Sequence, residues 1–448
     1  MTTRTVQKAP AEVMQAVPIR RLDPERGIQS VEDLADHLYV AAQVELSTIP
    51  MYLYSTYSIK THGHSQWAAP RGALRSMVGI SIEEMLHLAL VRNLLVGIGY
   101  GDMISFYDKD FIPKYPSKML NRYNTDDPDG AEITLNLSRL SPDSVKTFRR
   151  VEMPDKVKPD VTTYAEHPEA VGQYTSLGEF YRAIEDGFVR LDKKIKWAKD
   201  DVRYQYKRGF WNEFGNGKPI RVFNLATARK ALNIIIEQGE GTTSQHKYIK
   251  LRPGVEDYTH YEKFLRIERG EEGFGVVDGV NDQIRLNDPK AIGKAVWPVV
   301  ANPTVDRYKD QPGIHSLMTL FNAAYCYTLC ILDEVYEHTT DDVEWKKLPG
   351  TDREERFSER YGLERNNVAI MEGILYPLAQ LLVSTPIPGG PDKGQHAGPS
   401  FEFYDFDADT ATSSKQQLIK LCDEAIDHFP ALGGPDGVRR QITLLADV

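Results

Sequence analysis

The sequence has few cysteines, no long apolar run and no excess of positive charge. Its three cysteines are too few for a disulfide framework, which favours a reducing, intracellular setting. No stretch approaches the roughly 18 consecutive apolar residues of a membrane span. The N-terminal residues MTTRTVQKAPAEV also lack the apolar core of a signal peptide. We therefore expect a cytoplasmic protein without a membrane partner.

The charge balance excludes a further class of protein. The 54 Lys and Arg residues are outnumbered by 64 Asp and Glu residues, which gives a formal net charge of −10 over 448 residues. An acidic chain without a basic run is poorly suited to neutralise phosphates, so we expect no nucleic-acid partner. Hydrophobic residues make up 41% of the chain and charged residues 26%, as in soluble folded proteins.

Apolar residues spaced three and four apart predict a mainly helical protein. Ser30 and Asp33 approximate a capping box at the start of the first helix, and Pro50 is expected to kink this helix. The second helix follows Pro70 and is apolar nearly all round, which is typical of a buried helix. The four helices expected before residue 242 span 31–59, 71–99, 176–198 and 224–241.

The rest of the chain is expected to form long connections and shorter helices around these four helices. Residues 100–170 are rich in Pro, Asp, Asn and Tyr and include one strand-like run, EITLNLS, so they predict a long loop and strand excursion rather than helices. Shorter helical patterns follow at 257–270, 315–337, 366–384 and 414–428. The predicted organisation is a tail over 1–27, a bundle over 28–270, a wrapping linker over 271–312 and a helical extension over 313–448.

Each of the four main helices carries an acid on an apolar face. These acids are Glu45, Glu84, Glu185 and Glu237, and His87 lies three residues after Glu84. An isolated buried carboxylate is destabilised by several kcal/mol, so it must be protonated, paired or bound to a metal. Few arginines are available on the same helices to pair with all four acids.

This pattern matches a four-helix bundle that holds a dinuclear metal site. Such a site takes one Glu from each of two helices and a Glu-x-x-His pair from each of the others. Glu84-Met85-Leu86-His87 is the only Glu-x-x-His in the chain, and its two side chains project to the same side of a helix. Carboxylates together with imidazole suit iron or manganese better than a thiolate-seeking metal.

The second half of the motif is irregular. The residue three after Glu237 is Glu240, not His, and the helix pattern breaks at Gly241. Either His246 or His260 can supply the missing imidazole, and His260 is preferred because it lies on an apolar helical pattern. Two neighbouring acids leave further alternatives. Asp186 replaces Glu185 if the helical register shifts by one residue, and Glu83 is expected to contact an arginine or a histidine behind the ligands.

At these residues the sequence resembles a known family. The stretches Glu45-Leu46-Ser47-Thr48-Ile49-Pro50, Glu84-x-x-His87 and Glu237-Gln238-Gly239-Glu240-Gly241 resemble the ferritin-like domain of the iminophenylpyruvate dimer synthases. WPVVANP and AGPSFEFY extend the resemblance over most of residues 28–405. Enzymes of that family act in violacein and rebeccamycin biosynthesis, where they oxidatively couple two imines derived from tryptophan.

The resemblance implies a ferritin-like four-helix bundle with iron as its metal. The metal ligands that it implies are Glu45, Glu84, His87, Glu185, Glu237 and His260, with Glu240 as a bridging or additional ligand. We expect a non-haem iron oxidase or oxygenase that uses two or more iron ions and O₂ in specialised metabolism. The expected partner is a small substrate, either an amino acid or an α-imino acid, and homo-oligomerisation is left open. Tyr52 shares the Glu45 face, so it is a candidate catalytic residue as well as a candidate core aromatic.

Two other functional classes are compatible with the same acids. Iron storage needs only a bare bundle, whereas this chain has additional helices and long connections that argue for a substrate pocket. A scaffold with structural acids predicts instead that the protein contains no tightly bound metal.

Overall fold

The computed structural model describes residues 27–60, 72–118, 133–153, 174, 177–207, 218–239, 258–274, 285–339, 343–347 and 354–448. The described residues are mostly helical, as predicted. The main helices of the first part are α1 (Val31–Tyr57), α2 (Gly72–Gly97), α3 (Pro142–Val151), α5 (Leu177–Leu191), α6 (Leu225–Gly239) and α7 (His260–Glu268). Those of the second part are α8 (Pro289–Ala295), α9 (Pro312–Glu337), α10 (Glu359–Ile370), α11 (Tyr376–Ser384), α12 (Ser414–Ile426) and α13 (Val438–Thr443).

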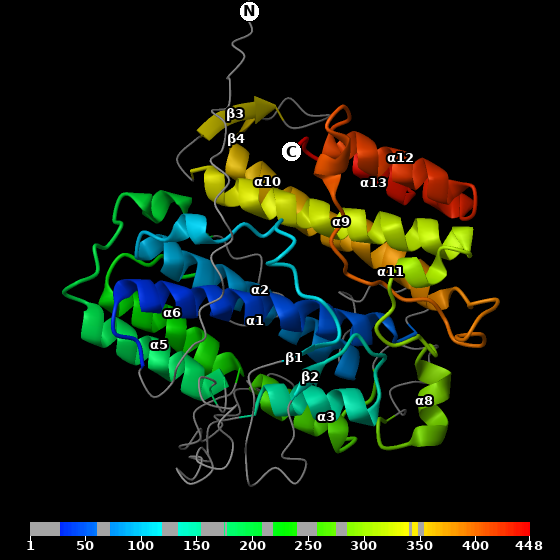
Figure 1. Cartoon of the computed structure of the whole chain (residues 1–448), viewed down its shortest axis with the longest axis horizontal. Helices are drawn as coiled ribbons and strands as arrows, with labels where there is room; N and C mark the ends of the chain where they lie inside the picture. Colours follow the sequence, from blue (N-terminus) through cyan, green and yellow to red (C-terminus); the bar gives the residue numbers. More distant parts are fainter. Residues whose placement is uncertain are drawn as a thin grey trace, which may run out of the picture.

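Helices α1, α2, α5 and α6 form the predicted four-helix bundle (Figure 1). The capping box at the start of α1 is confirmed, because the Ser30 side chain accepts from the Asp33 backbone N–H while the Asp33 carboxylate accepts from Ser30. Helix α1 continues through Pro50 to Tyr57. Helix α2 has no exposed residue, and Glu32 is the only exposed residue of α1. Both helices therefore lie inside the protein.

The excursion after α2 differs from its prediction in one respect. It contains a short antiparallel pair, β1 (Ser117–Lys118) and β2 (Thr134–Leu135), and β2 falls in the predicted strand-like run. It also contains helix α3, so the prediction that this region lacks helices is wrong. A capping box between Ser141 and Ser144, with Pro142 in the first turn, starts α3. Phe148 and Val151 are buried on one face, and α3 packs against α7.

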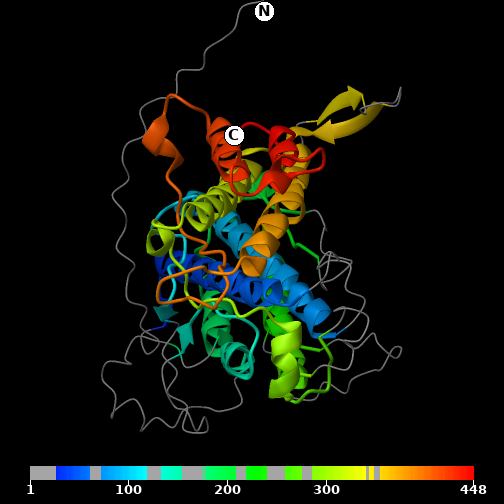
Figure 2. The same ribbon diagram turned by 90° about the vertical axis from the view of Figure 1, so that its right-hand side faces the viewer.

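The C-terminal helices pack on the opposite side of α1 and α2 from α3 and α7. Figures 1 and 2 show α9 to α13 on one side of these two central helices and α3 and α8 on the other. One core cluster includes Leu38 of α1, Leu90 of α2, Leu320 of α9 and Leu418 of α12. A β-hairpin, β3 (Val343–Lys347) with β4 (Glu354–Ser358), precedes α10. A five-residue π-helical turn, Met371–Leu375, joins α10 to α11.

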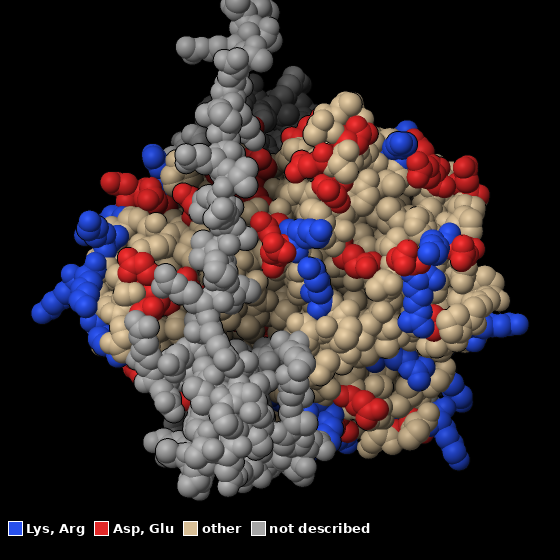
Figure 3. Space-filling model, in the orientation of Figure 1, with Lys and Arg blue, Asp and Glu red and all other residues tan. Residues whose placement is uncertain are grey.

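Within the described ranges, two helical segments are long and apolar enough to cross a membrane by length and composition alone. They are Pro312–Glu337 and Glu359–Ser384. In the first segment 78% of the most apolar window is buried inside the protein, as in the core helix of a folded domain, and in the second 39% is buried. Figure 3 shows acidic and basic side chains interspersed over the face that it presents.

Candidate metal centre

A cluster of buried acids and imidazoles lies where α1 and α2 meet α3 and α7. Helix α1 supplies Glu45, and α2 supplies Glu84 and His87. Glu152 follows the last residue of α3, and His260 is the first residue of α7. These five residues are at most 3% exposed. The cluster therefore places three carboxylates and two imidazoles in a dry interior.

The five side chains form two groups that share one carboxylate. The first group is Glu45, Glu84 and His87, and the second is Glu84, Glu152 and His260. Within each group the candidate ligand atoms lie within 4.8 Å of one another. The rings of His87 and His260 are roughly parallel, with centroids 5.5 Å apart. Two three-residue groups joined by Glu84 are the arrangement expected for a dinuclear site with one shared carboxylate.

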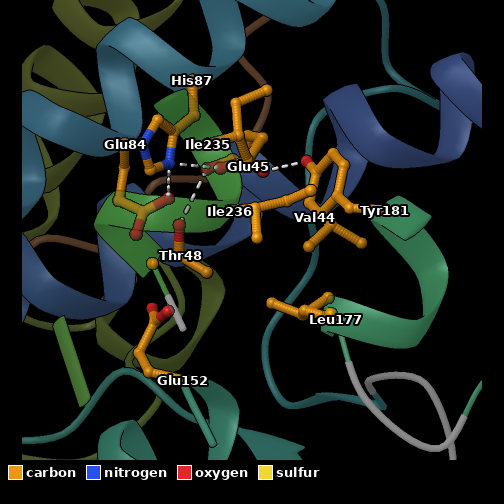
Figure 4. A pocket seen from close by; sticks show the side chains of 12 residues that line it. Val44, Glu45, Thr48, Glu84, His87, Glu152, Leu177, Tyr181, Ile235 and Ile236 are labelled. Carbon is orange, nitrogen blue, oxygen red and sulfur yellow. Dashed lines mark hydrogen bonds and ion pairs between the residues drawn. The ribbon is translucent and has the colours of Figure 1, made fainter. Parts of the chain in front are cut away.

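In each histidine the nitrogen that faces the cluster is Nδ1. His87 Nδ1 lies 3.6 Å from Glu45 Oε2 and 3.5 Å from Glu84 Oε2 (Figure 4). His260 Nδ1 lies 2.9 Å from Glu84 Oε1 and 3.7 Å from Glu152 Oε2. Among the described residues His260 Nδ1 is buried without a hydrogen-bond partner, although the Glu84 oxygen lies at ion-pair distance. A buried ring nitrogen in this position is suited to bind a metal ion.

The other nitrogen of each ring contacts a group behind the cluster. His260 Nε2 lies 2.9 Å from Glu83 Oε2, and the same oxygen accepts from Lys263 Nζ at 2.6 Å. His87 Nε2 lies 3.0 Å from Gln238 Oε1 on α6. Because both partners are oxygen acceptors, each Nε2 donates its hydrogen, and each Nδ1 can offer a lone pair to a metal once it gives up its own proton. The expectation that Glu83 contacts a histidine agrees with this geometry.

Two tyrosines donate hydrogen bonds to carboxylates of the cluster. Tyr181 on α5 donates to Glu45 Oε1, and Figure 4 shows its ring directed at that carboxylate. Tyr52 donates to Glu152 Oε1 at 2.5 Å, and its ring packs against Phe148 and Phe264. Both phenols fix the orientation of a carboxylate. Tyr52 is fully buried among aromatic rings, whereas Tyr181 lines a cavity.

The electrostatics of the cluster favour the binding of positive charge. Burial and the neighbouring Glu84 raise the pKa of Glu45 to about 8. Burial on its own lowers the pKa of His87, but contacts with Glu45 and Glu84 raise it to about 10. Burial opposes ionisation of Glu83, yet Lys263 and His260 lower the pKa of this acid to about 2. A cluster that binds protons so firmly in a dry site also suits a cation with the same ligands.

A small cavity opens beside the cluster. Its volume is about 20 Å³, enough for roughly one water-sized molecule. One side of it is formed by Glu45, Glu84, His87 and Glu152, and Val44, Leu177, Ile235 and Ile236 form an apolar side. His260 does not line the cavity. The cluster thus has an accessible side at His87 and an enclosed side at His260.

The structure brings together only some of the predicted ligands. Glu45, Glu84, His87 and His260 meet in the cluster, whereas Glu185 and Glu237 do not. Glu185 on α5 forms an ion pair with Arg229 on α6, with Nε and Oε1 2.7 Å apart. Glu237 is exposed. Glu240 and His246 lie outside the described residues.

Helical register explains why Glu185 and Glu237 lie outside the cluster. Helix α6 presents Ile235, Ile236 and Gly239 to the cavity, and one residue turns a helix by about 100°, so Glu237 points away. Helix α5 presents Tyr181 and Ile184, which turns Glu185 toward α6. Asp186, the alternative to Glu185, is exposed. Both helices have a solvent-facing side, and their acids occupy or border it.

Glu152 was missed by the sequence prediction. It lies in the excursion that was expected to contain no helix, so no apolar face was assigned to it. The usable signal was the capping sequence Ser-Pro-Asp-Ser at 141–144, followed by apolar Val145, Phe148 and Val151. This pattern predicts a short amphipathic helix that ends next to Glu152.

Comparison with known proteins adds sequence relationships to this geometry. The family model described as Ferritin-like matches residues 38–269. A dichlorochromopyrrolate synthase from Lentzea aerocolonigenes is 25% identical over 412 residues, covering 84% of this chain and 36% of that protein. A 2-imino-3-(indol-3-yl)propanoate dimerase from Chromobacterium violaceum is 24% identical, covering 83% of this chain and 34% of that protein. The chain thus spans about a third of the length of these curated relatives.

A solved structure is also similar. The crystal structure of a ferritin-like protein from Caulobacter vibrioides has a TM-score of 0.42 and 20% identity, covering 69% of this chain and 88% of that chain.

Proposed function

This chain belongs to the ferritin-like family, and we propose that it is a non-haem iron enzyme that uses O₂ to oxidise a small substrate derived from an amino acid. The observation that carries the proposal is the pair of ligand groups joined by Glu84. Three carboxylates and two imidazoles are a donor set that suits iron. The Nε2 atoms of His87 and His260 already contact Gln238 and Glu83, so both rings are oriented with Nδ1 toward a metal.

The residues of the cluster divide the work of such a centre. Glu45 and His87 would hold one iron ion, Glu152 and His260 the other, and Glu84 both. Bound ferrous ions would supply the electrons that O₂ accepts. Tyr181 holds a proton at Glu45 Oε1, and Tyr52 holds one at Glu152 Oε1, so each carboxylate keeps its orientation when its charge changes.

The cavity beside His87 gives the centre a sheltered approach. Its apolar side of Val44, Leu177, Ile235 and Ile236 excludes water from the open side of the cluster. Its volume of about 20 Å³ has room for roughly one water-sized molecule, so an organic substrate would meet the centre at the cavity mouth. The names of the two curated relatives support an α-imino acid or its parent amino acid as that substrate. We further propose a cytoplasmic protein without nucleic-acid or membrane partners.

The first experiment is metal analysis after anaerobic reconstitution with ferrous ion, followed by measurement of O₂ consumption. Wild type should bind two iron ions per chain and consume O₂ with an amino-acid or imino-acid substrate. Glu84→Ala should lose both iron ions and His87→Ala one of them, and both variants should lose O₂ consumption. Glu237→Ala is the matched control, because this glutamate of α6 is exposed, and it should behave as wild type.

The outcomes separate this function from its rivals. No tightly bound iron in wild type would overturn the proposal and favour a scaffold with structural acids. Iron that is bound and oxidised in large excess over two ions per chain, without any effect of organic substrates, would favour iron storage.

A further inference from the structure

The two halves of the cluster have the same kinds of ligand but differ behind their histidines. We call Glu45, Glu84 and His87 the cavity half-site, and Glu84, Glu152 and His260 the inner half-site. Each half-site has one histidine that faces the cluster through Nδ1. Each also has one carboxylate of its own that accepts a tyrosine hydroxyl. The difference lies behind the histidines.

The inner histidine is backed by an ion pair. Its Nε2 hydrogen is donated to Glu83, a carboxylate that is 2% exposed and receives Lys263 at 2.6 Å. Glu83 directly precedes the shared ligand Glu84, and Lys263 lies three residues after His260 on α7. This contact therefore ties α2 to α7 and fixes the ring plane of His260. Lys263 compensates the negative charge of Glu83, so Glu83 can remain ionised in the interior whether or not a metal is bound.

The cavity histidine is backed by a neutral amide. His87 Nε2 donates to Gln238 Oε1 on α6, at 3.0 Å. An amide oxygen polarises an imidazole less than a carboxylate does, so His87 is a weaker electron donor through Nδ1 than His260. All three ligands of the cavity half-site line the cavity, whereas the inner half-site borders it through Glu84 and Glu152 but not through His260. A small molecule in the cavity can therefore reach an ion held at His87 more readily than one held at His260.

We infer that the Glu83–Lys263 pair is a positioning device that makes the inner half-site bind metal before the cavity half-site. This inference rests on the proposed function, since it concerns the same centre. The inner ion is then held firmly, and the cavity ion is the exchangeable one that faces the incoming small molecule. Glu83 acts through His260 and is not itself a ligand.

The test uses cobalt(II) as a spectroscopic probe of the full chain, followed by titration with ferrous ion under anaerobic conditions. Cobalt(II) absorption reports each coordination environment and needs no turnover. His87→Ala leaves the inner half-site intact, and His260→Ala leaves the cavity half-site intact. We expect His87→Ala to retain one ion at least about 10-fold more tightly than His260→Ala does, the lower end of the effect of groups behind a ligand.

Substitutions of Glu83 and Gln238, the residues behind the histidines, then test whether these contacts cause the difference in metal affinity between the half-sites. Glu83→Gln in the His87→Ala background should weaken the remaining ion by about 10- to 100-fold. The same change in the His260→Ala background should have no effect. Gln238→Glu in the His260→Ala background should strengthen the cavity half-site. Glu237→Gln, next to Gln238 but exposed, is the control and should change neither half-site.

Two further measurements separate the loss of the Glu83 contact from an unpaired Lys263 and from misfolding. Glu83→Gln/Lys263→Met removes both charges and should weaken the inner half-site by the same factor, which separates the loss of the contact from an unpaired Lys263. Circular dichroism verifies the helical content of each variant. Equal affinity of the two half-sites, or equal effects of Glu83→Gln on both, would overturn the inference while leaving the iron enzyme intact. Failure of wild type to bind any metal would instead overturn the proposed function.

Discussion

Helices α1 and α2 form one half of the bundle and α5 and α6 the other, yet among the described residues of these four helices only the first pair contributes to the candidate metal cluster. All four helices carry a glutamate within an apolar stretch, so the sequence pattern predicts a metal ligand on each of them. The difference is their surroundings. The first pair lies between the other bundle helices and the C-terminal helices, while α5 and α6 border solvent (Figures 1 and 2). An acid on a helix with a solvent-exposed face can lie on that face. Glu45 and Glu84 lie on helix segments that are buried on all sides, so they are buried too.

The largest effect is expected where the two ligand groups share a residue. Glu84→Ala should reduce bound iron from two ions per chain to none, because each group loses a carboxylate that the other cannot replace. Elemental analysis of protein reconstituted with ferrous ion measures this loss. Retention of one ion would show that Glu84 belongs to only one half-site.

The next effect concerns Glu152, the candidate ligand at the end of α3. Glu152→Gln keeps the size of the side chain but removes its charge, so we expect the inner half-site to bind its ion at least about 10-fold more weakly. Metal titration monitored by cobalt(II) absorption measures the change. Asp143→Asn removes an exposed acid at the other end of α3 and should leave both half-sites unchanged. An unaltered affinity in Glu152→Gln would exclude α3 from the centre.

These comparisons also show how far the sequence could predict the site. Glu45, Glu84 and His87 were identifiable because nearly all the residues around them on α1 and α2 are buried, so an error of one residue in register would still leave each of them inside the protein. On α6 an error of one residue rotates a side chain by about 100°, and Ile236 rather than Glu237 faces the cavity. His260 was placed by its apolar helix, but no spacing rule links α7 to α2.

Fold prediction succeeded and failed for similar reasons. The long helices and the Ser30 cap follow from local patterns, and the structure confirms them. Helix α3 was missed because its cap and its three apolar positions lie in a stretch whose Pro and Asp content indicates loops. Its stability comes from packing against α7, more than a hundred residues later, which no local pattern contains.

A smaller effect is expected from pH on the metal-free protein. Contacts with Glu45 and Glu84 outweigh the effect of burial and raise the pKa of His87 to about 10, above its usual 6.5. A raised pKa contributes stability that is fully present below pH 6.5 and is lost as the pH rises to about 10. Glu45, with a pKa raised to about 8 mainly by burial, acts in the same direction. With a chelator present, the Tm should therefore fall as the pH rises over this range.

Bound metal should reverse that trend. Ligands must lose their protons to bind a metal, so binding strengthens as the pH rises and stabilises the folded state. Thermal unfolding with and without ferrous ion, recorded from pH 6 to pH 9, measures both slopes. His87→Gln should flatten the metal-free slope. Identical slopes with and without metal would contradict the placement of these groups at a metal centre.

The smallest effect is expected from the two glutamates that distinguish the α5–α6 half of the bundle. Glu185→Ala/Glu237→Ala should bind two iron ions with wild-type affinity, because neither carboxylate is part of the cluster. Glu185 does pair with Arg229, but that arginine side chain is 54% exposed, and surface pairs contribute about 0.2–1 kcal/mol. The free energy of unfolding, measured with a chemical denaturant and a chelator, should therefore fall by no more than about 1 kcal/mol. Loss of an ion would mean that α5 or α6 rotates to deliver its acid when metal binds, and the difference between the two halves of the bundle would then be confined to the metal-free state.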